Sequence, residues 1–158
     1  MHSTLFVYLK KERIEFNMSN LSFFLAGNVE KRENKKVVVS DRFKDEKGNA
    51  VAWEIRSISA GEDEEIRKAC TKRVPVVGKR GQFAQEFDGN AYLAKLAAKA
   101  VVYPDLNNAE LQNSYKVMGA EALVKEMLYK DEFDTLTEQI VSVTDTEDIN
   151  ELADEAKN

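Results

Sequence analysis

The residue types that covalent catalysis needs are almost absent from this chain. Its 158 residues include one histidine, His2, and one cysteine, Cys70. Nucleophilic catalysis places a general base beside a serine or cysteine nucleophile, and a tetrahedral zinc site made of cysteine and histidine takes more ligands than one of each. The sequence therefore predicts neither a Ser-His or Cys-His dyad nor a zinc site, and we expect a protein that is not an enzyme.

Two further patterns only partly match chemical sites. Gly78-Lys79-Arg80-Gly81 lacks the upstream glycine and the hydroxyl residue after lysine that a phosphate loop requires. The six acids between Asp145 and Glu155 have neither the spacing nor the central glycine of a calcium loop. A solvated helix face explains these acids, with attraction to a basic partner as the functional alternative. We predict no metal and no cofactor.

The segment from Glu62 to Arg80 has the most uneven charge pattern of the chain. Four consecutive acids, Glu62 to Glu65, precede six cations with no acid among them: Arg67, Lys68, Lys72, Arg73, Lys79 and Arg80. Basic residues near aromatic ones can pair with phosphates and stack on bases. A small nucleic-acid-binding regulator that uses residues 67–80 is therefore one hypothesis, and a protein-binding loop is the other.

The overall charge favours a protein partner. The net charge is −5, and residues 105–158 carry 4 Lys and Arg against 14 Asp and Glu. Such an acidic region repels a polyanion. Nucleic acid is therefore the disfavoured partner, and the nucleic-acid-binding regulator remains the alternative.

Local signals place the charged segment at the start of a helix. Ser59 and Glu62 form an S-x-x-E capping box, and acids in the first turn match the helix dipole. Ile66, Ala69 and Cys70 form an inward stripe. We expect the cations from Arg67 to Arg73 to complement the end of this helix, before Pro75 prevents its continuation.

Strand signals lie on both sides of this helix. Residues 37–43 and 51–56 are rich in β-branched and aromatic residues and flank a turn-forming KDEKGNA, which predicts a β-hairpin with Trp53 as a core anchor. The sequence also allows a second short hairpin. It would pair residues 74–77 with 82–87 around the Gly78–Gly81 loop, placing Lys79 and Arg80 at its tip and Phe83 and Phe87 on one face.

The second half of the chain has helical periodicity. Asp88 can cap a central helix of residues 92–101, Pro104 ends it, and Asn107 with Glu110 offers the next cap. Apolar residues at i, i+3, i+4 spacing then predict three further helices, around residues 120–128, 133–141 and 149–156. The predicted fold is α+β, with an N-terminal β-hairpin region and a mainly α-helical C-terminal half; the oligomeric state stays open.

The N-terminal segment divides at Met18. We interpret residues 1–17 as a non-native or disordered extension, because Met18 precedes a natural helix start; a genuine N-terminal strand with Leu5, Val7 and Leu9 is the alternative. Residues 18–158 are then one domain with an acidic helical C-terminus. From Ser19 a short helix runs through Leu25, with Gly27 available for a left-handed exit. Its apolar face must dock on its own domain or on a partner, and consists of Leu21, Phe24 and Leu25.

The composition fits an ordinary globular protein made and kept in the cytoplasm. Hydrophobic residues make up 43% and charged residues 32% of the chain. No apolar run approaches the 18 or so residues that a membrane span needs, and the N-terminal stretch lacks the order of a signal peptide. The single cysteine suits a reducing compartment, so we expect no membrane contact.

Several long blocks of the chain together carry a resemblance to a known family: MSNLSFFLAGNVEKRENKKVVVSDRFKDEKGNAVAWEI, EDEEIRKACTKRV, YLAKLAAKAVVYPDLNNAELQNSYKVMGAEALVKEML and the closing EAKN. Through these blocks, which agree in order, the chain from Met18 onward resembles the XkdN-like tail assembly chaperones of phages and prophages of Gram-positive bacteria. The resemblance implies a non-enzymatic protein of tail morphogenesis. Such a protein binds the tape measure protein, keeps it soluble until tail tube subunits assemble around it, and is absent from the finished virion.

The resemblance also suggests the tail tube protein as a second partner, and it provides no catalytic motif to transfer. The binding residues are therefore predicted from the chain itself. They are the apolar residues of the short N-terminal helix and the tip and aromatic face of the second hairpin, namely Leu21, Phe24, Leu25, Lys79, Arg80, Phe83 and Phe87.

Overall fold

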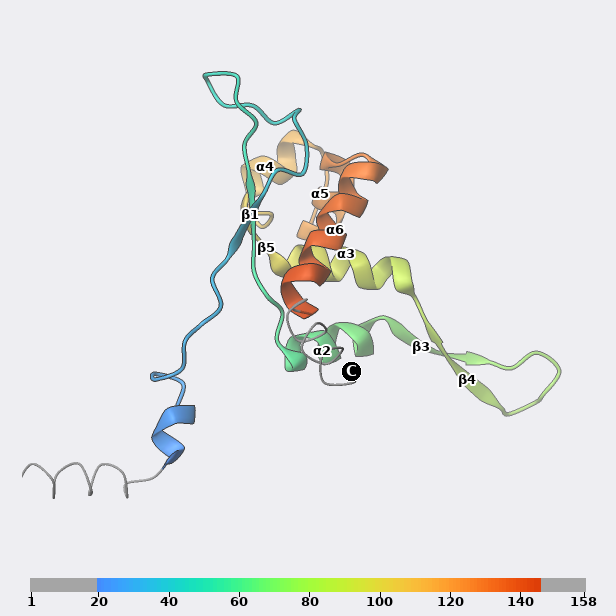
Figure 1. Ribbon diagram of the computed structural model, residues 1–158. Helices are drawn as coiled ribbons and strands as arrows, with labels where there is room; N and C mark the ends of the chain where they lie inside the picture. The colour runs from blue at the N-terminus through green and yellow to red at the C-terminus, as the bar shows by residue number, and fades with distance from the viewer. Residues whose placement is uncertain (1–19, 146–158) are drawn as a thin grey trace, which may run out of the picture. The chain divides into compact units, whose positions relative to one another are not determined.

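The computed structural model describes residues 20–145 (Figure 1). The chain divides into two compact units, residues 1–32 and residues 33–158. The described part of the first unit, residues 20–32, contains one 3-10 helix, η1 (Asn20–Phe24). Gly27 has no positive φ, so the expected left-handed exit is wrong. The N-terminal extension 1–17, the cap at Ser19 and the helix predicted over residues 149–156 all lie outside the described residues.

The second unit contains a three-stranded antiparallel sheet in the order β1-β2-β5. Its strands are β1 (Lys35–Val37), β2 (Trp53–Ile55) and β5 (Val101–Tyr103). The first predicted hairpin is confirmed, because β1 pairs with β2 with Val37 opposite Trp53. Trp53 and Ile55 are buried, as the alternation in the sequence predicts.

The predicted bounds of the first strand, residues 37–43, are wrong. After Val37 the chain leaves the sheet, because Val39 and Ser40 turn into the interior and the Ser40 hydroxyl accepts a hydrogen bond from the Arg42 amide at 3.1 Å. The two arms meet again at the isolated bridge between Lys44 and Ala50. The side chain of Arg42 is thereby directed to the helical half.

Helix α2 (Ala60–Ala69) begins at the predicted cap. The Ser59 hydroxyl accepts a hydrogen bond from the Glu62 amide at 3.2 Å. The helix is shorter than predicted, because residues from Thr71 onward pair as a strand, β3 (Thr71–Pro75). Arg67 lies in the last turn of α2, as expected, whereas Lys72 and Arg73 belong to β3 and not to the helix end.

Strand β5 was not predicted. The predicted central helix ends at Ala100, and Val101 begins a strand that pairs with β2. The signal was present, since Val101 and Val102 are β-branched and a residue before a proline prefers extended backbone. The Arg56 amide donates to the Ala100 carbonyl at 3.0 Å, which fixes this change from helix to strand.

Four further helices lie in the second unit as far as residue 145: α3 (Gly89–Ala100), α4 (Ala109–Ser114), α5 (Ala120–Met127) and α6 (Lys130–Asp145). Helix α3 is central, as predicted, and packs against α2, α5 and α6. Asp88 caps it by accepting from the Ala91 amide at 3.0 Å. The mixed α+β class is confirmed, with the helices mostly in the C-terminal half.

Helix α4 is capped one residue later than predicted. Its cap is Asn108 and not Asn107, since the Asn108 side chain accepts from the Leu111 amide at 2.9 Å. The helix ends at Ser114, and Lys116 then adopts a φ of 55°. Met118, four residues beyond the end of this helix, is 91% exposed.

One hydrophobic core joins the sheet to the helices. Cys70 is 2% exposed and packs as a small apolar residue, as predicted. No helix of the described residues is long and apolar enough to cross a membrane. The buried cluster consists of Val39, Trp53, Ile55, Ile58, Ile66, Cys70, Leu96, Ala97, Ala100, Val101, Leu106, Leu123, Val124, Met127, Leu128, Leu136 and Ile140.

Candidate partner-binding site

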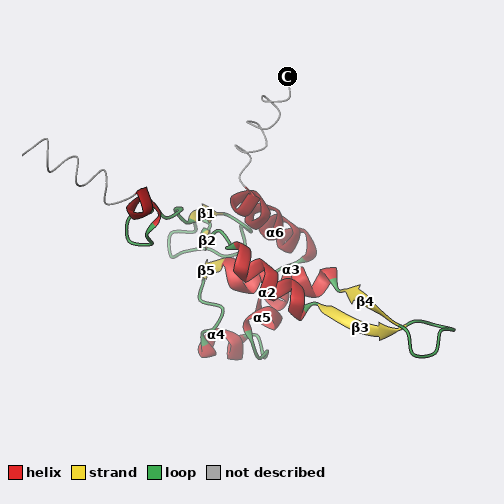
Figure 2. Ribbon diagram, turned by 90° about the horizontal axis from the view of Figure 1, so that it is seen from below, coloured by secondary structure: helices red, strands yellow, loops and turns green. Residues whose placement is uncertain are grey.

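A two-stranded hairpin extends away from the helices of the second unit (Figures 1 and 2). Its strands are β3 and β4 (Phe83–Phe87), paired antiparallel from Thr71 opposite Phe87 to Pro75 opposite Phe83. None of the five residues of β4 is buried. The second hairpin that the sequence allowed is therefore confirmed, and β3 begins three residues earlier than predicted.

The tip of this hairpin consists of two consecutive tight turns. The Lys79 amide donates to the Val76 carbonyl at 3.2 Å, and the Gln82 amide donates to the Lys79 carbonyl at 3.1 Å. Gly78 and Gly81 each occupy the third position of a turn, with φ of 79° and 80°. This is the geometry of type II turns, where glycine is favoured. Lys79 and Arg80 lie at the exposed tip, as expected; their role in binding stays a prediction.

The strand register gives the hairpin two different faces. Residues directly opposite each other in a strand pair share a face, so β3 and β4 place their alternate residues together. One face, which we call the aromatic face, contains Thr71, Arg73, Pro75, Phe83, Gln85 and Phe87. The opposite face contains Lys72, Val74, Ala84 and Glu86.

Arginine side chains cover the rings of the aromatic face. The Arg73 guanidinium lies 4.2 Å from the centre of the Phe83 ring. The Arg67 guanidinium lies 5.9 Å from the Phe87 ring and 4.7 Å from the Tyr92 ring. Phe83 nevertheless remains 51% exposed and Phe87 47% exposed. The aromatic face thus combines accessible apolar rings with cations held directly above them.

Asp63 fixes Arg67 at the base of the hairpin. Its carboxylate accepts hydrogen bonds from the Tyr92 hydroxyl and, at 2.7 Å, from Arg67 Nε. The Tyr92 hydroxyl first, and Arg67 second, lower the pKa of Asp63 below its usual range. Burial, helped by the neighbouring Asp63, raises the pKa of Tyr92. Asp63 is therefore ionised at neutral pH and orients Arg67 toward both rings.

The sequence did not indicate Arg67 and Arg73 as members of this face. Both were assigned to the end of a helix, which explained their charge. The signal for Arg73 is the strand register, because the pairing of Thr71 with Phe87 and of Pro75 with Phe83 places Arg73 on the same face as both rings. Predicting that register requires the start of β3, which was placed three residues too late.

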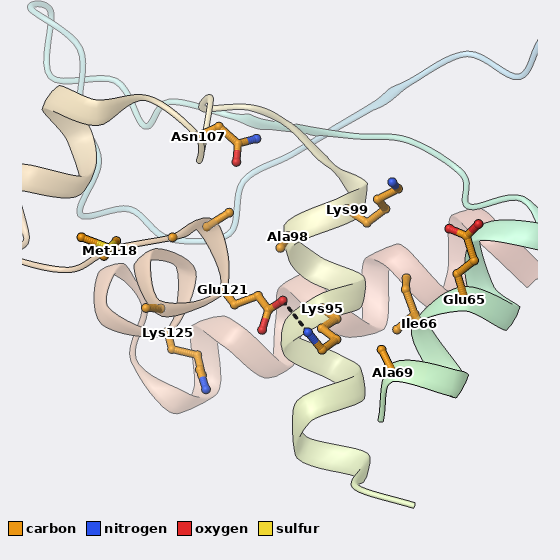
Figure 3. Close-up of a pocket in the computed structure, with 13 residues that line it drawn as sticks. Glu65, Ile66, Ala69, Lys95, Ala98, Lys99, Asn107, Met118, Glu121 and Lys125 are labelled. Carbon is orange, nitrogen blue, oxygen red and sulfur yellow. Dashed lines mark hydrogen bonds and ion pairs between the residues drawn. The ribbon is translucent and has the colours of Figure 1, made fainter. Parts of the chain in front are cut away.

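A groove of about 770 Å³ lies between α2, α3 and the start of α5 (Figure 3). Small or apolar side chains, among them Ala69, Ala98 and Ala122, line it together with charged ones. Lys95 of α3 and Glu121 of α5 form an ion pair of 2.9 Å that links the two helices. This groove was not predicted from the sequence. The feature of the sequence that could have indicated it is the presence of alanines on helical faces that are not fully buried.

The apolar residues of the first unit form another candidate surface. In η1 and the residue after it, Leu21 is 64%, Phe24 77% and Leu25 51% exposed. Phe23, which was not among the predicted binding residues, is 69% exposed. These residues belong to the first unit, whereas the hairpin belongs to the second.

The second unit is an α+β domain whose exposed aromatic face and groove suit the binding of another polypeptide. A family model for the phage XkdN-like tail assembly chaperone protein matches residues 21–157. The chain belongs to this family of phage tail assembly chaperones, which confirms the resemblance seen in the sequence.

Relatives of similar length support this assignment. The chain is 30% identical over 144 residues to the phage-like element PBSX protein XkdN of Bacillus subtilis (strain 168), covering 90% of this chain and 96% of that protein. It is 29% identical over 141 residues to YqbN of the same organism, covering 88% and 93%. The crystal structure of YqbN is similar in fold, with a TM-score of 0.67 and 25% identity over 82% of this chain and 98% of that one.

Proposed function

We propose that this tail assembly chaperone binds the tape measure protein and keeps it soluble until the tail tube polymerises around it. The observation that supports this most is the aromatic face, whose two phenylalanines are about half exposed on a hairpin that extends away from the core. A large exposed apolar patch usually marks a binding surface. On this proposal, the aromatic face covers an apolar stripe of the tape measure protein before the tube surrounds it.

The aromatic face can bind such a stripe in two ways at once. Covering the exposed parts of Phe83 and Phe87 removes apolar area from water, at about 25 cal/mol per Å². The Arg73 guanidinium lies over the Phe83 ring, so it can donate to carboxylates that border the stripe. Lys79 and Arg80 at the tip add positive charge that speeds encounter with an acidic segment.

The same proposal covers the remaining functional expectations. The tail tube protein is a second candidate partner, because the chaperone must release the tape measure protein as the tube forms. The chain acts in the cytoplasm of the bacterial host, has no catalytic step and is left out of the mature virion.

The charge pairs of the basic segment favour a protein over a nucleic acid as the partner. Arg67 forms an ion pair of 2.7 Å with Asp63, and Lys68 one of 3.0 Å with Glu64. Phosphate contacts would compete with these carboxylates. A nucleic-acid-binding regulator would show a complex at low salt that weakens steeply as salt is added; we expect no such complex.

Co-expression with the tape measure protein tests the proposal. The wild-type chain is expected to hold the tape measure protein in the soluble fraction and to co-purify with it. The double variant Phe83→Ser, Phe87→Ser should lose about 2 kcal/mol of binding free energy, or roughly 30-fold in affinity, because half of each ring no longer contributes apolar area. Affinity is measured by titration calorimetry.

The matched control is the double variant Val38→Ser, Val102→Ser. These valines are 54% and 43% exposed and lie outside the hairpin, so binding should be unchanged. Urea unfolding checks that both double variants are folded. Equal binding by wild type and the phenylalanine variant would contradict the aromatic face as the binding surface.

Two more variants separate the candidate surfaces. Ala98→Arg places a long side chain in the groove, and Phe24→Ser removes an exposed ring from the first unit. We expect both to bind the tape measure protein as the wild type does. Loss of binding in either one would move the site to that surface, and failure of the wild type to bind would contradict the proposed partner itself.

A further inference from the structure

The backbone hydrogen bonds of the hairpin show which peptide groups point to its outer edges. In an antiparallel pair, opposite residues alternate between pairs that exchange backbone hydrogen bonds and pairs whose amides and carbonyls point away from the partner strand. The Val76 amide donates to the Gln82 carbonyl at 3.0 Å, and the Asp88 amide donates to the Cys70 carbonyl at 2.9 Å. These two bonds, at the two ends of the hairpin, fix the alternation along it.

The two outer edges therefore differ in the groups that they present. The edge of β4 presents the amide and the carbonyl of each outward-pointing residue. The edge of β3 is incomplete, because proline has no amide proton. Within residues 20–145 neither edge pairs with a further strand. The opposite residues whose backbone groups point outward are Thr71 with Phe87, Arg73 with Gln85, and Pro75 with Phe83.

The edge of β4 is complementary to the same edge of a second copy. When two β4 strands lie antiparallel around Gln85, this residue is opposite its own counterpart, and Phe83 is opposite Phe87 of the other copy. All three outward-pointing residues of each strand then exchange both backbone hydrogen bonds. Glu86, the only charged residue of β4, is opposite Ala84 of the other copy, so no like charges face each other.

The residues that flank β4 are also complementary in charge. Beyond Phe83 the same register places Gln82 opposite Asp88 of the other copy, and it brings the cations of the tip, Lys79 and Arg80, to the base of the other hairpin. Glu86 and Asp88 provide carboxylates at this base. A cavity of about 350 Å³ lies there, lined by Lys72, Glu86, Phe87, Asp88, Gly89 and Asn90.

We propose that two copies of this chain pair through the outer edges of their β4 strands. The hairpin extends away from the helices of the second unit, so this edge is accessible to another molecule (Figures 1 and 2). The pair contains one four-stranded antiparallel sheet with two-fold symmetry, in the order β3-β4-β4-β3. Each tip meets the base of the other hairpin, so the contact between cations and acids occurs twice.

The pairing joins the aromatic faces of the two copies. Because opposite residues in a strand pair share a face, both aromatic faces lie on the same side of the four-stranded sheet. Phe83 of each copy lies beside Phe87 of the other, while the rings stay accessible from above. The pairing uses the edge of β4 and not its face, so it goes beyond the proposed function and does not depend on it.

Sedimentation velocity on the full chain tests the pairing. One strand edge with its neighbouring rings is a small contact, below the size of a stable interface of about 1,200 Å², so we expect association at tens of micromolar. The mass should rise from 17.9 kDa toward twice this value between about 1 μM and about 500 μM. A single chain at every concentration would overturn the proposal.

Two proline variants test which edge is used. Gln85→Pro removes an outward-pointing amide of β4 that the hairpin itself does not use, and it should weaken association at least about tenfold. Arg73→Pro makes the same change at the opposite residue, on the edge of β3, and should leave association as in the wild type. Circular dichroism checks that both are folded. Equal association of the two variants would overturn the edge of β4 as the interface.

A charge exchange at the two-fold axis tests the register without proline. Gln85→Lys and Gln85→Glu each place like charges opposite each other in the pair, so each variant alone should associate about tenfold more weakly than the wild type. An equimolar mixture of the two variants places lysine opposite glutamate and should restore association. A mixture that associates no better than either variant alone would overturn the pairing around Gln85.

Binding of the tape measure protein provides a separate readout. Gln85→Pro keeps Phe83 and Phe87, so each single chain should still bind the tape measure protein in the co-expression experiment. A chain that forms the pair but binds no tape measure protein would uphold the pairing and contradict the proposed function. A chain that binds the tape measure protein but stays single would do the reverse, so the two failures are distinguishable.

Discussion

Replacing Trp53 by alanine is expected to lower the free energy of unfolding by about 3–5 kcal/mol, the cost of removing a buried tryptophan and leaving a cavity. Trp53 is 2% exposed and its ring centre lies 5.8 Å from that of Phe43. It lies in β2, the middle strand of the sheet, so neighbours on both sides prevent the site from collapsing. Urea denaturation followed by far-ultraviolet circular dichroism measures the effect.

A matched truncation at an exposed ring provides the control for this result. Phe83→Ala removes a ring that is 51% exposed in the hairpin and should change the free energy of unfolding by less than about 1 kcal/mol. Trp53→Phe keeps an aromatic ring, so its loss in the free energy of unfolding should lie between those of Phe83→Ala and Trp53→Ala. A loss below about 1 kcal/mol for Trp53→Ala would mean that the sheet does not anchor the core as the structure indicates.

Replacing Glu132 by glutamine is expected to remove a pH-dependent part of the stability. Arg42 contacts Glu132 through two hydrogen bonds, of 2.6 and 3.1 Å, and the Tyr129 amide donates to the same carboxylate at 2.8 Å. Arg42 also donates to the Met127 carbonyl at 2.8 Å. It therefore links the loop after β1 to the end of α5 and the start of α6.

These contacts set the sign of the pH effect. The hydrogen bond from Arg42 is the largest cause that lowers the pKa of Glu132 from 4.5 to about 2. A lowered pKa in the folded state stabilises the protein above the unfolded pKa, and this contribution disappears as the pH falls from about 4.5 through about 2. Because Arg42 is partly exposed, the contribution at pH 7 is about 2 kcal/mol, less than the full shift implies.

Urea unfolding of both proteins between pH 7 and pH 2 measures this effect. The difference between wild type and Glu132→Gln should be about 2 kcal/mol at pH 7 and should shrink toward zero as the pH falls to about 2, since the carboxyl is then protonated in the unfolded chain and about half protonated in the folded one. Glu138→Gln, at an exposed position of the same helix, should change stability little at any pH. A difference that stays constant with pH would contradict an ionic role for Glu132.

Local signals in the sequence predicted the elements that form through neighbouring residues. The cap at Ser59, the buried alternation around Trp53 and the glycine turns at Gly78 and Gly81 each depend on a few adjacent residues, and all are present. The family was also evident from long blocks of the sequence, because they agree in order with its known members.

Contacts between distant parts of the chain account for what was missed. The first strand ends early because Ser40 turns inward and Arg42 meets Met127 and Glu132, about ninety residues away. Helix α2 ends early because β4 pairs with the residues that follow it. The arginines over the rings of the aromatic face and the groove between α2, α3 and α5 also depend on contacts between separate segments. A pattern within one segment of the sequence therefore could not locate them.

The hairpin that presents the aromatic face is a sheet of two strands, so within the described residues each strand has one outer edge without a backbone partner. Such edges are templates for strand addition between molecules. The edge of β3 is guarded by the ring of Pro75, which lacks an amide proton, and by the charges of Lys72 and Arg73. The edge of β4, with the sequence FAQEF, has Glu86 as its only charge. Once two copies have paired there, the edges that remain are both those of β3, so we expect the hairpin not to seed fibrils even at high concentration.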